Sequence, residues 1–284
     1  MSALLTAAST AEPPDDFVRR HGTVVATFDH RTQDSGNVSW LVETPAGAMF
    51  VKTAGVPGPP PPGAPVPYFD HAGRVALLRN AVALARSCAH PALARLHNVV
   101  ESPAGPVLVY ARAPGELVGT ERARRADPRS AYQRFAHLPA ARLLGVFDVL
   151  VDLHERLAGP GWVASDLYDG CLLVELTTGR LTVIDLDAYR RGPGTNTMGR
   201  MFGSTRFMAP EEFELGAPVD ERTTVFTLGR LAWHFGTRLT ERAERFCGPP
   251  DLVAVVRRAC ERAREERYAG VADFAAGWRR ARGA

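Results

Sequence analysis

Cysteine, lysine, net charge and long apolar runs are all scarce in this chain of 284 residues. The four cysteines form no CxxC pair, so the sequence indicates neither a zinc site nor a disulfide framework, and reduced thiols are the expected state. No apolar run reaches the roughly 18 residues that a membrane-spanning helix needs, and the first residues lack the basic segment of a signal peptide. A net charge of +3 is too small to indicate nucleic-acid binding. We therefore expect a cytoplasmic protein without a nucleic-acid or membrane partner.

Hydrophobic residues make up 45% of the chain and charged residues 23%, which is ordinary for a protein with a substantial core. Residues 1–19 are small, polar and proline-containing, and we expect a flexible tail there. Residues 56–67 (VPGPPPPGAPVP) cannot form a helix or a central strand, because proline fixes φ and lacks an N–H group. We interpret them as an extended connector, with a ligand for a proline-binding domain as the alternative.

The apolar periodicity predicts two regions of different character. Up to about residue 110 the pattern is that of an antiparallel sheet, with one helix, at about 73–88, inserted after the third strand. Beyond it the chain is mainly helical, with one predicted β-hairpin, at 171–184, whose strands are joined by TTG. The predicted helices of this second region cover residues 140–157, 223–235, 251–264 and 271–282.

Three residues in short, distinctive stretches are candidates for chemistry. Lys52 ends an apolar strand in MFVKTAG, where nearly all other positive charge in the chain is arginine. Asp166 lies in GWVASDLYDGCLLVE, and Asp185 follows 19 residues later in LTVIDLDAY. A loop and a strand pair of that length can return the second carboxylate to the first, and carboxylate oxygen is the ligand that magnesium prefers.

The stretch GSTRFMAPEEF at 203–213 is the most specific, and RAREERYAGVADF follows it near the end of the chain. In this order the stretches resemble the motifs of the eukaryotic-like Ser/Thr protein kinases in a divergent bacterial form. Ala209–Glu211 then stands at the A-P-E motif. The resemblance implies that Glu211 forms a buried, bidentate ion pair with Arg267.

The resemblance covers about residues 20–282 and implies an α+β, two-lobed protein-kinase-like fold. It places a sheet lobe at about 20–110, a hinge at 110–117 and a helical lobe at 118–282. The implied activity is transfer of the γ-phosphate of ATP to a serine or threonine hydroxyl of a protein substrate.

The resemblance also assigns roles to single residues. Asp166 would orient the acceptor hydroxyl, and Asp185, with Asp187, would bind Mg²⁺. The residues expected to contact ATP are Ser35, Gly36, Asn37, Lys52, Tyr110, Ala111, Ala113 and Leu173.

Several positions depart from the family pattern. The G-x-G-x-x-G loop is absent, with Gly36 alone in QDSGNVSW. Ala81 stands where a glutamate should pair with the strand lysine, so we expect either that another acid, such as Asp70 or Glu43, compensates or that Lys52 is held less firmly. Cys171 replaces the asparagine that binds a second magnesium, and a thiol is a poor ligand for that ion.

Three further replacements affect the loop around Asp166. Ala164 and Thr224 replace residues that brace it, so we expect those bonds to be lost. Ser165 replaces the arginine that senses a phosphorylated segment, so we expect activity not to depend strongly on phosphorylation of Thr205.

Two other functions stay open on the sequence. A kinase for a small molecule, such as an antibiotic or a metabolite, is indicated by the serine/asparagine-type loop and by the D-L-D stretch at 185–187. A catalytically inactive pseudokinase scaffold is indicated by the losses at Ala81, Ala164 and Cys171. An unrelated α+β domain with chance motif matches is the remaining alternative.

Overall fold

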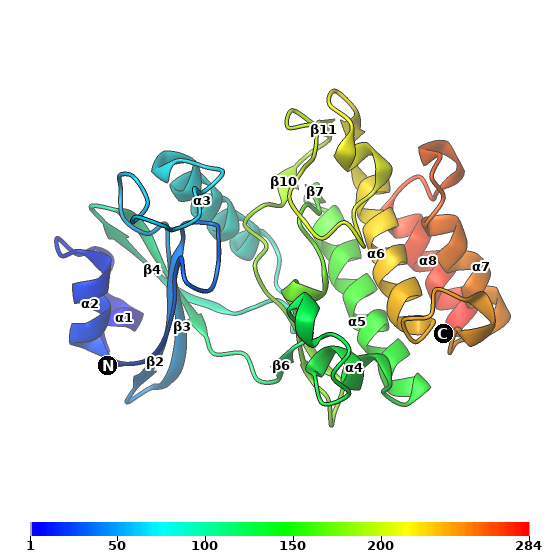
Figure 1. The fold of residues 1–284 in the computed structure, drawn as a ribbon, viewed down its shortest axis with the longest axis horizontal. Coiled ribbons are helices and arrows are strands. Elements are labelled where there is room, and N and C mark those ends of the chain that lie inside the picture. Colours follow the sequence, from blue (N-terminus) through cyan, green and yellow to red (C-terminus); the bar gives the residue numbers. More distant parts are fainter. Residues whose placement is uncertain (1, 284) are drawn as a thin grey trace. The chain divides into compact units, whose positions relative to one another are not determined.

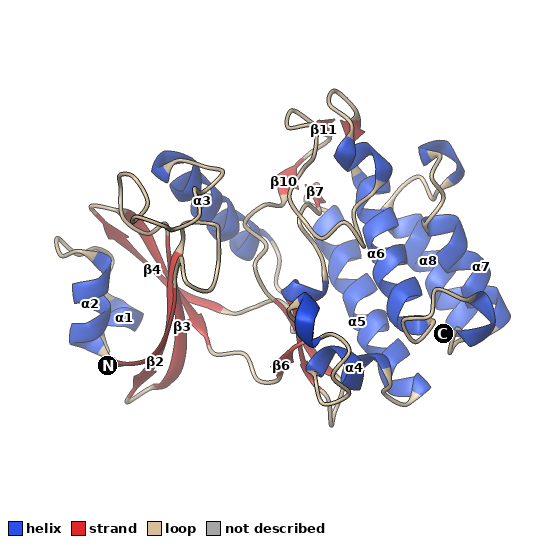
Figure 2. Cartoon of the chain, viewed as in Figure 1, coloured by secondary structure: helices blue, strands red, loops and turns tan. Residues whose placement is uncertain are grey.

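The computed structural model describes residues 2–283 and is α+β, with eight α-helices and twelve strands among those residues (Figures 1 and 2). The chain divides into two compact units. The described residues up to Arg86, with Ala94–Ala113, form the sheet unit. Ser87–Leu93 and the chain from Pro114 onward form the helical unit. Each unit is treated by itself below.

A five-stranded antiparallel sheet with the order β1-β2-β3-β5-β4 forms the centre of the sheet unit. Tight turns join β2 to β3 and β4 to β5, as the PAG and SPAG turns of the sequence predict. The strands are β1 Thr23–Phe28, β2 Val38–Thr44, β3 Gly47–Thr53, β4 Leu96–Ser102 and β5 Gly105–Ala111.

The expectation of a flexible tail over residues 1–19 is wrong, because the described part of that range, residues 2–19, forms packed structure. Helices α1 (Ala3–Thr6) and α2 (Pro14–His21) cover one face of the sheet (Figure 1). Leu4, Phe17 and Val18 are buried there in one core with strand side chains. The pattern of α2 explains why PDDFVRRH is helical: proline in the first turn, acidic residues beside it and basic residues in the last turn.

The opposite face of the sheet carries α3 (His71–Ser87), which packs Leu78, Ala81 and Val82 against Leu108 of β5. The proline-rich segment 56–67 contains neither helix nor strand, as the sequence predicts. Its base is held by Arg74, the buried arginine of α3, whose guanidinium donates hydrogen bonds to the carbonyls of Ala54, Val56 and Phe69.

The helical unit is built around long helices that pack on one another. Its α-helices are α4 Ala131–Ala136, α5 Ala140–Ala158, α6 Glu221–Gly236, α7 Pro250–Ala259 and α8 Val271–Arg282. Nearly every residue of α6 is buried, as its continuous apolar pattern predicts. Asp220 begins α6 by accepting a hydrogen bond from the backbone N–H of Arg222.

Short strands and 3₁₀ helices connect these helices. The strands are β6 Glu116–Leu117, β7 Trp162–Val163, β8 Leu172–Glu175, β9 Arg180–Val183, β10 Arg190–Arg191, β11 Gly194–Thr195 and β12 Pro218–Val219. The 3₁₀ helices are η1 Arg122–Arg124, η2 Asp169–Cys171, η3 Pro210–Phe213, η4 Ala243–Arg245 and η5 Arg264–Glu266. Strands β8 and β9 pair as the predicted hairpin, with β6 beside β8.

One prediction about these helices was wrong, and one helix was missed. The helix expected over 251–264 ends at Ala259, because residues 264–267 turn away so that Arg264 and Arg267 both reach Glu211. The short helix α4, capped by the hydroxyl of Ser130, was not predicted at all. No helix among residues 2–283 is long and apolar enough to cross a membrane.

Candidate functional site

Lys52 lies near the end of β3, opposite Leu108 of β5 and Ser39 of β2. Strand alternation puts Val51 into the core covered by α1 and α2, so Lys52 projects from the other face, on which α3 packs. Lys52 is also the only lysine of the chain, against 33 arginines, as its full sequence shows. Lysine and arginine are not interchangeable, because an ammonium is a compact point charge and a guanidinium a planar fork.

The Ser35–Asn37 turn, the expected phosphate loop, is tightly packed within the sheet unit. Gly36 has a left-handed backbone with φ of 76°, and a Cβ placed there would lie 2.5 Å from Cγ of Pro67 and 3.2 Å from Cζ of Arg74. The proline-rich segment therefore packs directly on the turn. Asn37 is buried, and among the described residues its Oδ1 has no hydrogen-bond partner. Because this amide oxygen is an acceptor, only a donor group can satisfy it, and a phosphate oxygen is not one.

The end of β5 carries the residues expected to contact adenine. The N–H of Ala111 donates to the carbonyl of Arg95 at 2.9 Å, and the N–H of Arg112 donates to Ala48 at 3.1 Å. Of the two backbone groups of Ala111, only its carbonyl is therefore a candidate for a ligand contact. Tyr110 and Ala113 are half-buried beside it in the sheet unit.

Glu43 and Asp70 are the two acids named above as possible substitutes for the glutamate missing at Ala81. Ala81 itself is buried in the core between α3 and β5. Glu43 lies four residues along β2 from Ser39, the strand partner of Lys52, which places it roughly 13 Å away. Glu43 is therefore not a substitute for the missing glutamate. Asp70 instead caps the start of α3, accepting a hydrogen bond from the N–H of Gly73 at 2.8 Å.

The helical unit holds the expected catalytic aspartate, Asp166, in the loop after β7. Its backbone is left-handed, with φ of 59°, a conformation that non-glycine residues seldom adopt and that clusters at functional sites. The thiol of Cys171 donates a hydrogen bond to the backbone carbonyl of Asp166 at 3.2 Å. Cys171 therefore braces the loop that presents the carboxylate.

Thr224 corrects a second expectation, that its substitution would remove a brace. The Oγ1 of Thr224, on the buried helix α6, accepts a hydrogen bond from the N–H of Ala164 at 2.9 Å. A threonine hydroxyl therefore anchors the Asp166 loop to the centre of the helical unit. Behind the loop, buried His154 donates through Nδ1 to the carbonyl of Leu150 and accepts through Nε2 from the hydroxyl of Tyr189 at 2.8 Å. Burial lowers the pKa of His154 to about 4, so this ring is neutral.

Asp185 follows β9 and is also left-handed, with φ of 62°. Its side chain is exposed, whereas that of Asp187 is buried. Burial raises the pKa of the Cys171 thiol well above its usual value, and the charges of Asp185 and Asp166 raise it further. The pKa of Tyr168 rises for the same reasons. Both aspartates therefore lie near enough to Cys171 for their charge to act on it, and Cys171 remains a neutral thiol.

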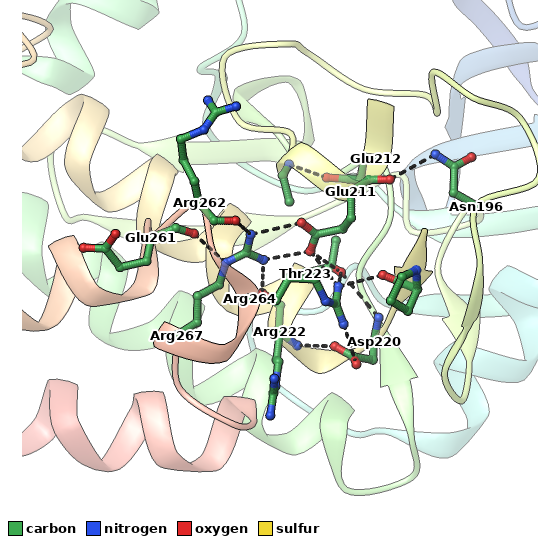
Figure 3. Close-up of polar contacts among 12 residues, drawn as sticks. Asn196, Glu211, Glu212, Asp220, Arg222, Thr223, Glu261, Arg262, Arg264 and Arg267 are labelled. Atoms are coloured by element: carbon green, nitrogen blue, oxygen red, sulfur yellow. Dashed lines mark hydrogen bonds and ion pairs between the residues drawn. The ribbon is translucent and has the colours of Figure 1, made fainter. Parts of the chain in front are cut away.

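The pair between Glu211 and Arg267 is confirmed. Their nitrogen and oxygen atoms meet at 2.7 and 3.0 Å (Figure 3), and the side chains are 3% and 0% exposed. Arg264 adds a third contact to Glu211 at 3.0 Å, and the hydroxyl of Thr223 donates to it at 2.8 Å. Burial is the largest single influence and acts to raise the pKa of Glu211, but the hydrogen bond and charge of Arg267, together with a backbone hydrogen bond and that of Thr223, outweigh it and leave that pKa lowered.

Glu212, the next residue, is 3% exposed and has the opposite electrostatic character. Its Oε2 accepts a hydrogen bond from the N–H of Ala209 at 2.7 Å. Burial raises the pKa of Glu212 to about 8, outweighing that hydrogen bond, and the charges of Glu211 and Asp166 add to the rise. Glu212 is therefore largely protonated at neutral pH.

The donor groups present fit ATP and Mg²⁺ in kind. Among residues 2–283 no cluster of three or more His, Cys, Asp or Glu side chains forms a metal cage. Magnesium sites that act on nucleotides commonly use one or two carboxylates, with phosphate oxygens and water completing the octahedron. Asp185 and Asp166 offer carboxylates of this kind in the helical unit, and Lys52 offers an ammonium group in the sheet unit. Leu173 is half-buried on β8 and offers an apolar contact.

A contact that sequence reasoning missed lies directly beside Asp166. Asp169 is 1% exposed and forms an ion pair with Arg206 at 2.8 Å. The sequence holds both residues, an acid three positions after Asp166 and an arginine three positions before Ala209. Comparing each motif separately with the family does not show that these two side chains meet.

No family model matches the chain, and no curated protein matches it either.

Proposed function

We propose that the chain is an ATP-dependent phosphotransferase with a two-lobed, protein-kinase-like fold, acting on serine or threonine hydroxyls of a protein. The observation that carries the proposal is the pair of left-handed aspartates, Asp166 and Asp185, both of which raise the pKa of the buried Cys171. Backbone strain of this kind is retained where the surrounding structure holds a functional group in place. The Glu211–Arg267 pair supports the resemblance from which these roles come.

Each residue then has a stated task. Lys52 holds the phosphates of ATP by charge, and Asp185 binds magnesium, which neutralises the charge of the transferred group. Asp166 accepts a hydrogen bond from the acceptor hydroxyl and takes its proton as the new oxygen–phosphorus bond forms and the bond to ADP breaks. Thr224 and Cys171 hold the Asp166 loop in position from two sides.

Calorimetric titration of ATP, with and without Mg²⁺, and transfer of labelled γ-phosphate to a generic basic protein test the proposal. We expect Asp166→Asn to lower transfer by about 10²-fold or more while ATP still binds, because general-base removal costs on that order. We expect Asp185→Asn to remove the magnesium-dependent part of ATP binding. Lys52→Arg keeps the charge and is expected to weaken binding, because the guanidinium is planar and larger.

The matched control is Asp15→Asn, an exposed aspartate of α2 that pairs with Arg19 and is expected to change nothing. Absence of ATP binding by the unaltered protein would contradict the proposal, and so would transfer that survives Asp166→Asn.

A second candidate function is a nucleotide-binding module that does not transfer phosphate. The specific observation in its favour is Cys171, whose thiol is neutral, buried and bonded to the Asp166 carbonyl, and therefore unsuited to bind a second magnesium. ATP binding with no transfer and no ATP hydrolysis supports this candidate. Slow hydrolysis that Asp166→Asn abolishes points instead to a small-molecule acceptor.

A further inference from the structure

Asp169 and Arg206 join the two segments that lie against the Asp166 carboxylate. Asp169 belongs to η2, three residues after Asp166, and Arg206 belongs to the stretch that leads into Ala209. The Nη2 of Arg206 lies 2.8 Å from both carboxylate oxygens of Asp169. A Cβ placed on Gly203 would lie 3.5 Å from Oδ1 of Asp166, so the segment that carries Arg206 approaches the carboxylate itself.

Arg206 is held by aromatic rings as well as by charge. Its guanidinium lies 4.6 Å from the ring centroid of Phe207 and 5.6 Å from that of Tyr132. Its Nε donates to the hydroxyl of Ser204 at 3.2 Å, and its own carbonyl accepts from Nε of Arg230 at 3.2 Å. Because these contacts lie on several sides, the Arg206 side chain is held in one position. A side chain must be fixed in this way if it is to position other groups.

The polar contacts continue behind Arg206 into α6. The hydroxyl of Tyr132 and Nε2 of His234 lie 2.5 Å apart, and Nδ1 of His234 lies 2.5 Å from Oε1 of Glu241. Glu241 also pairs with Arg230 at 3.1 Å. The Asp169–Arg206 pair therefore belongs to a connected network and is not an isolated surface contact, and networks of this kind are worth more than exposed pairs.

We propose that Arg206 is a positioning residue that holds the 203–208 segment against the Asp166 loop through a charge pair present without any modification. This inference rests on the proposed phosphotransferase function. In many kinases a phosphate added to this segment supplies negative charge to a catalytic-loop arginine. Here the signs are reversed: the loop supplies the carboxylate of Asp169 and the segment supplies the guanidinium of Arg206. The pair takes over the ordering role, and Thr205 needs no phosphate.

The reversed sign has a second consequence, at Ser204. Its hydroxyl oxygen already accepts a hydrogen bond from Nε of Arg206. A negative charge at Ser204 competes with Asp169 for the same guanidinium and leaves a carboxylate that is 1% exposed without its counter-charge. Negative charge in this segment therefore lowers activity instead of raising it.

The test compares Arg206→Met with Arg200→Met. Arg200 is an exposed arginine of the same region, and it donates one long hydrogen bond to the Gly203 carbonyl at 3.4 Å. Hydrogen exchange of peptides covering 166–171 and 203–208 is measured on the full chain, with Kd for ATP and kcat beside it. We expect Arg206→Met to speed exchange in both peptides and to lower kcat at least tenfold, with Kd for ATP within twofold. Arg200→Met is expected to change none of these quantities.

Three further samples complete the design. Phosphatase-treated protein and Thr205→Ala are expected to keep the full kcat, and Ser204→Glu is expected to lower kcat and speed exchange as Arg206→Met does. If Arg206→Met does not fold, Arg206→Lys replaces it, since it keeps the charge and loses the contact to both carboxylate oxygens.

Loss of activity on phosphatase treatment overturns the inference, and so does unchanged exchange in both peptides of Arg206→Met. If the unaltered protein transfers no phosphate, the proposed function fails, and the exchange measurement alone decides whether Arg206 holds the two segments together.

Discussion

Removing Arg267 is expected to be among the most destabilising single changes in the helical unit. The perturbation is Arg267→Met, which keeps most of the side-chain volume and removes the charge. Arg267 is 0% exposed and donates to Glu211 at 2.7 and 3.0 Å. It also donates to the backbone carbonyls of Glu261, Arg222 and Arg262 and lies 4.7 Å from the ring centroid of Phe226.

The magnitude follows from the burial of both partners. Breaking a buried pair by removing one partner costs about 3–5 kcal/mol, because the remaining charge keeps its desolvation cost without its counter-charge. In a unit of this size one kcal/mol corresponds to about 2–4 °C in Tm, so the expected loss is roughly 6–20 °C.

The contacts of Glu211 also predict an order among variants. After Arg267→Met, Glu211 still has Arg264 at 3.0 Å and the hydroxyl of Thr223 at 2.8 Å. After Glu211→Gln, two arginines face a neutral group, and one of them is fully buried. We therefore expect Glu211→Gln to cost at least as much as Arg267→Met. Arg264→Met should cost less than either, because Arg264 is partly exposed.

The assay is denaturant unfolding of each variant, followed by far-ultraviolet circular dichroism. Arg279→Met is the control, because Arg279 pairs with Glu155 on the surface and should cost less than about 1 kcal/mol. A loss in Arg267→Met no larger than in this control refutes the reasoning. The double variant Glu211→Gln/Arg267→Met gives the coupling energy directly.

Three further changes test other parts of the structure. Thr224→Val leaves the buried N–H of Ala164 without its acceptor, and we expect a loss of about 1–3 kcal/mol in urea unfolding; a Thr224→Ser variant that also loses that much would show that the hydroxyl is not the cause. Glu212 has a folded-state pKa of about 8, raised mainly by burial, so the folded state holds a proton that the unfolded state releases. Its contribution to stability is therefore complete below about pH 4.5 and is lost as pH rises toward 8, with a slope of up to about 1.4 kcal/mol per pH unit. Glu212→Gln should flatten stability between pH 5 and 8, and identical pH profiles for the two proteins would contradict this reasoning. Gly36→Ala places a Cβ 2.5 Å from Cγ of Pro67 at a φ of 76°, so we expect a loss of about 1–3 kcal/mol and weaker ATP binding; Gly63→Ala, where a Cβ meets nothing within 4 Å at a φ of 79°, is the matched control for the backbone strain alone.

Much of the fold was readable in the sequence, because it follows from local rules. Strand alternation, helical periodicity and turn residues place the hairpins of the sheet and helices α3, α5, α6 and α8 close to where the structure has them. The proline-rich segment lacks regular structure for an equally local reason, the missing N–H of proline. The resemblance to the kinase motifs also implies the Glu211–Arg267 pair, which the structure contains.

Tertiary structure alone decided which distant groups meet. Leu4, Phe17 and Val18 lie in a polar stretch, and only the uncovered face of the sheet makes it favourable to bury them. Thr224 replaces the lost brace of the Asp166 loop only because the packing of α6 places its Oγ1 2.9 Å from the backbone nitrogen of Ala164. Buried hydrogen bonds and ion pairs depend on the packing of elements far apart along the chain, and residue type does not encode that packing locally. The sequence thus shows which side chains are available for chemistry. The fold determines which of them form ion pairs, which stay neutral and which loops are held by hydrogen bonds.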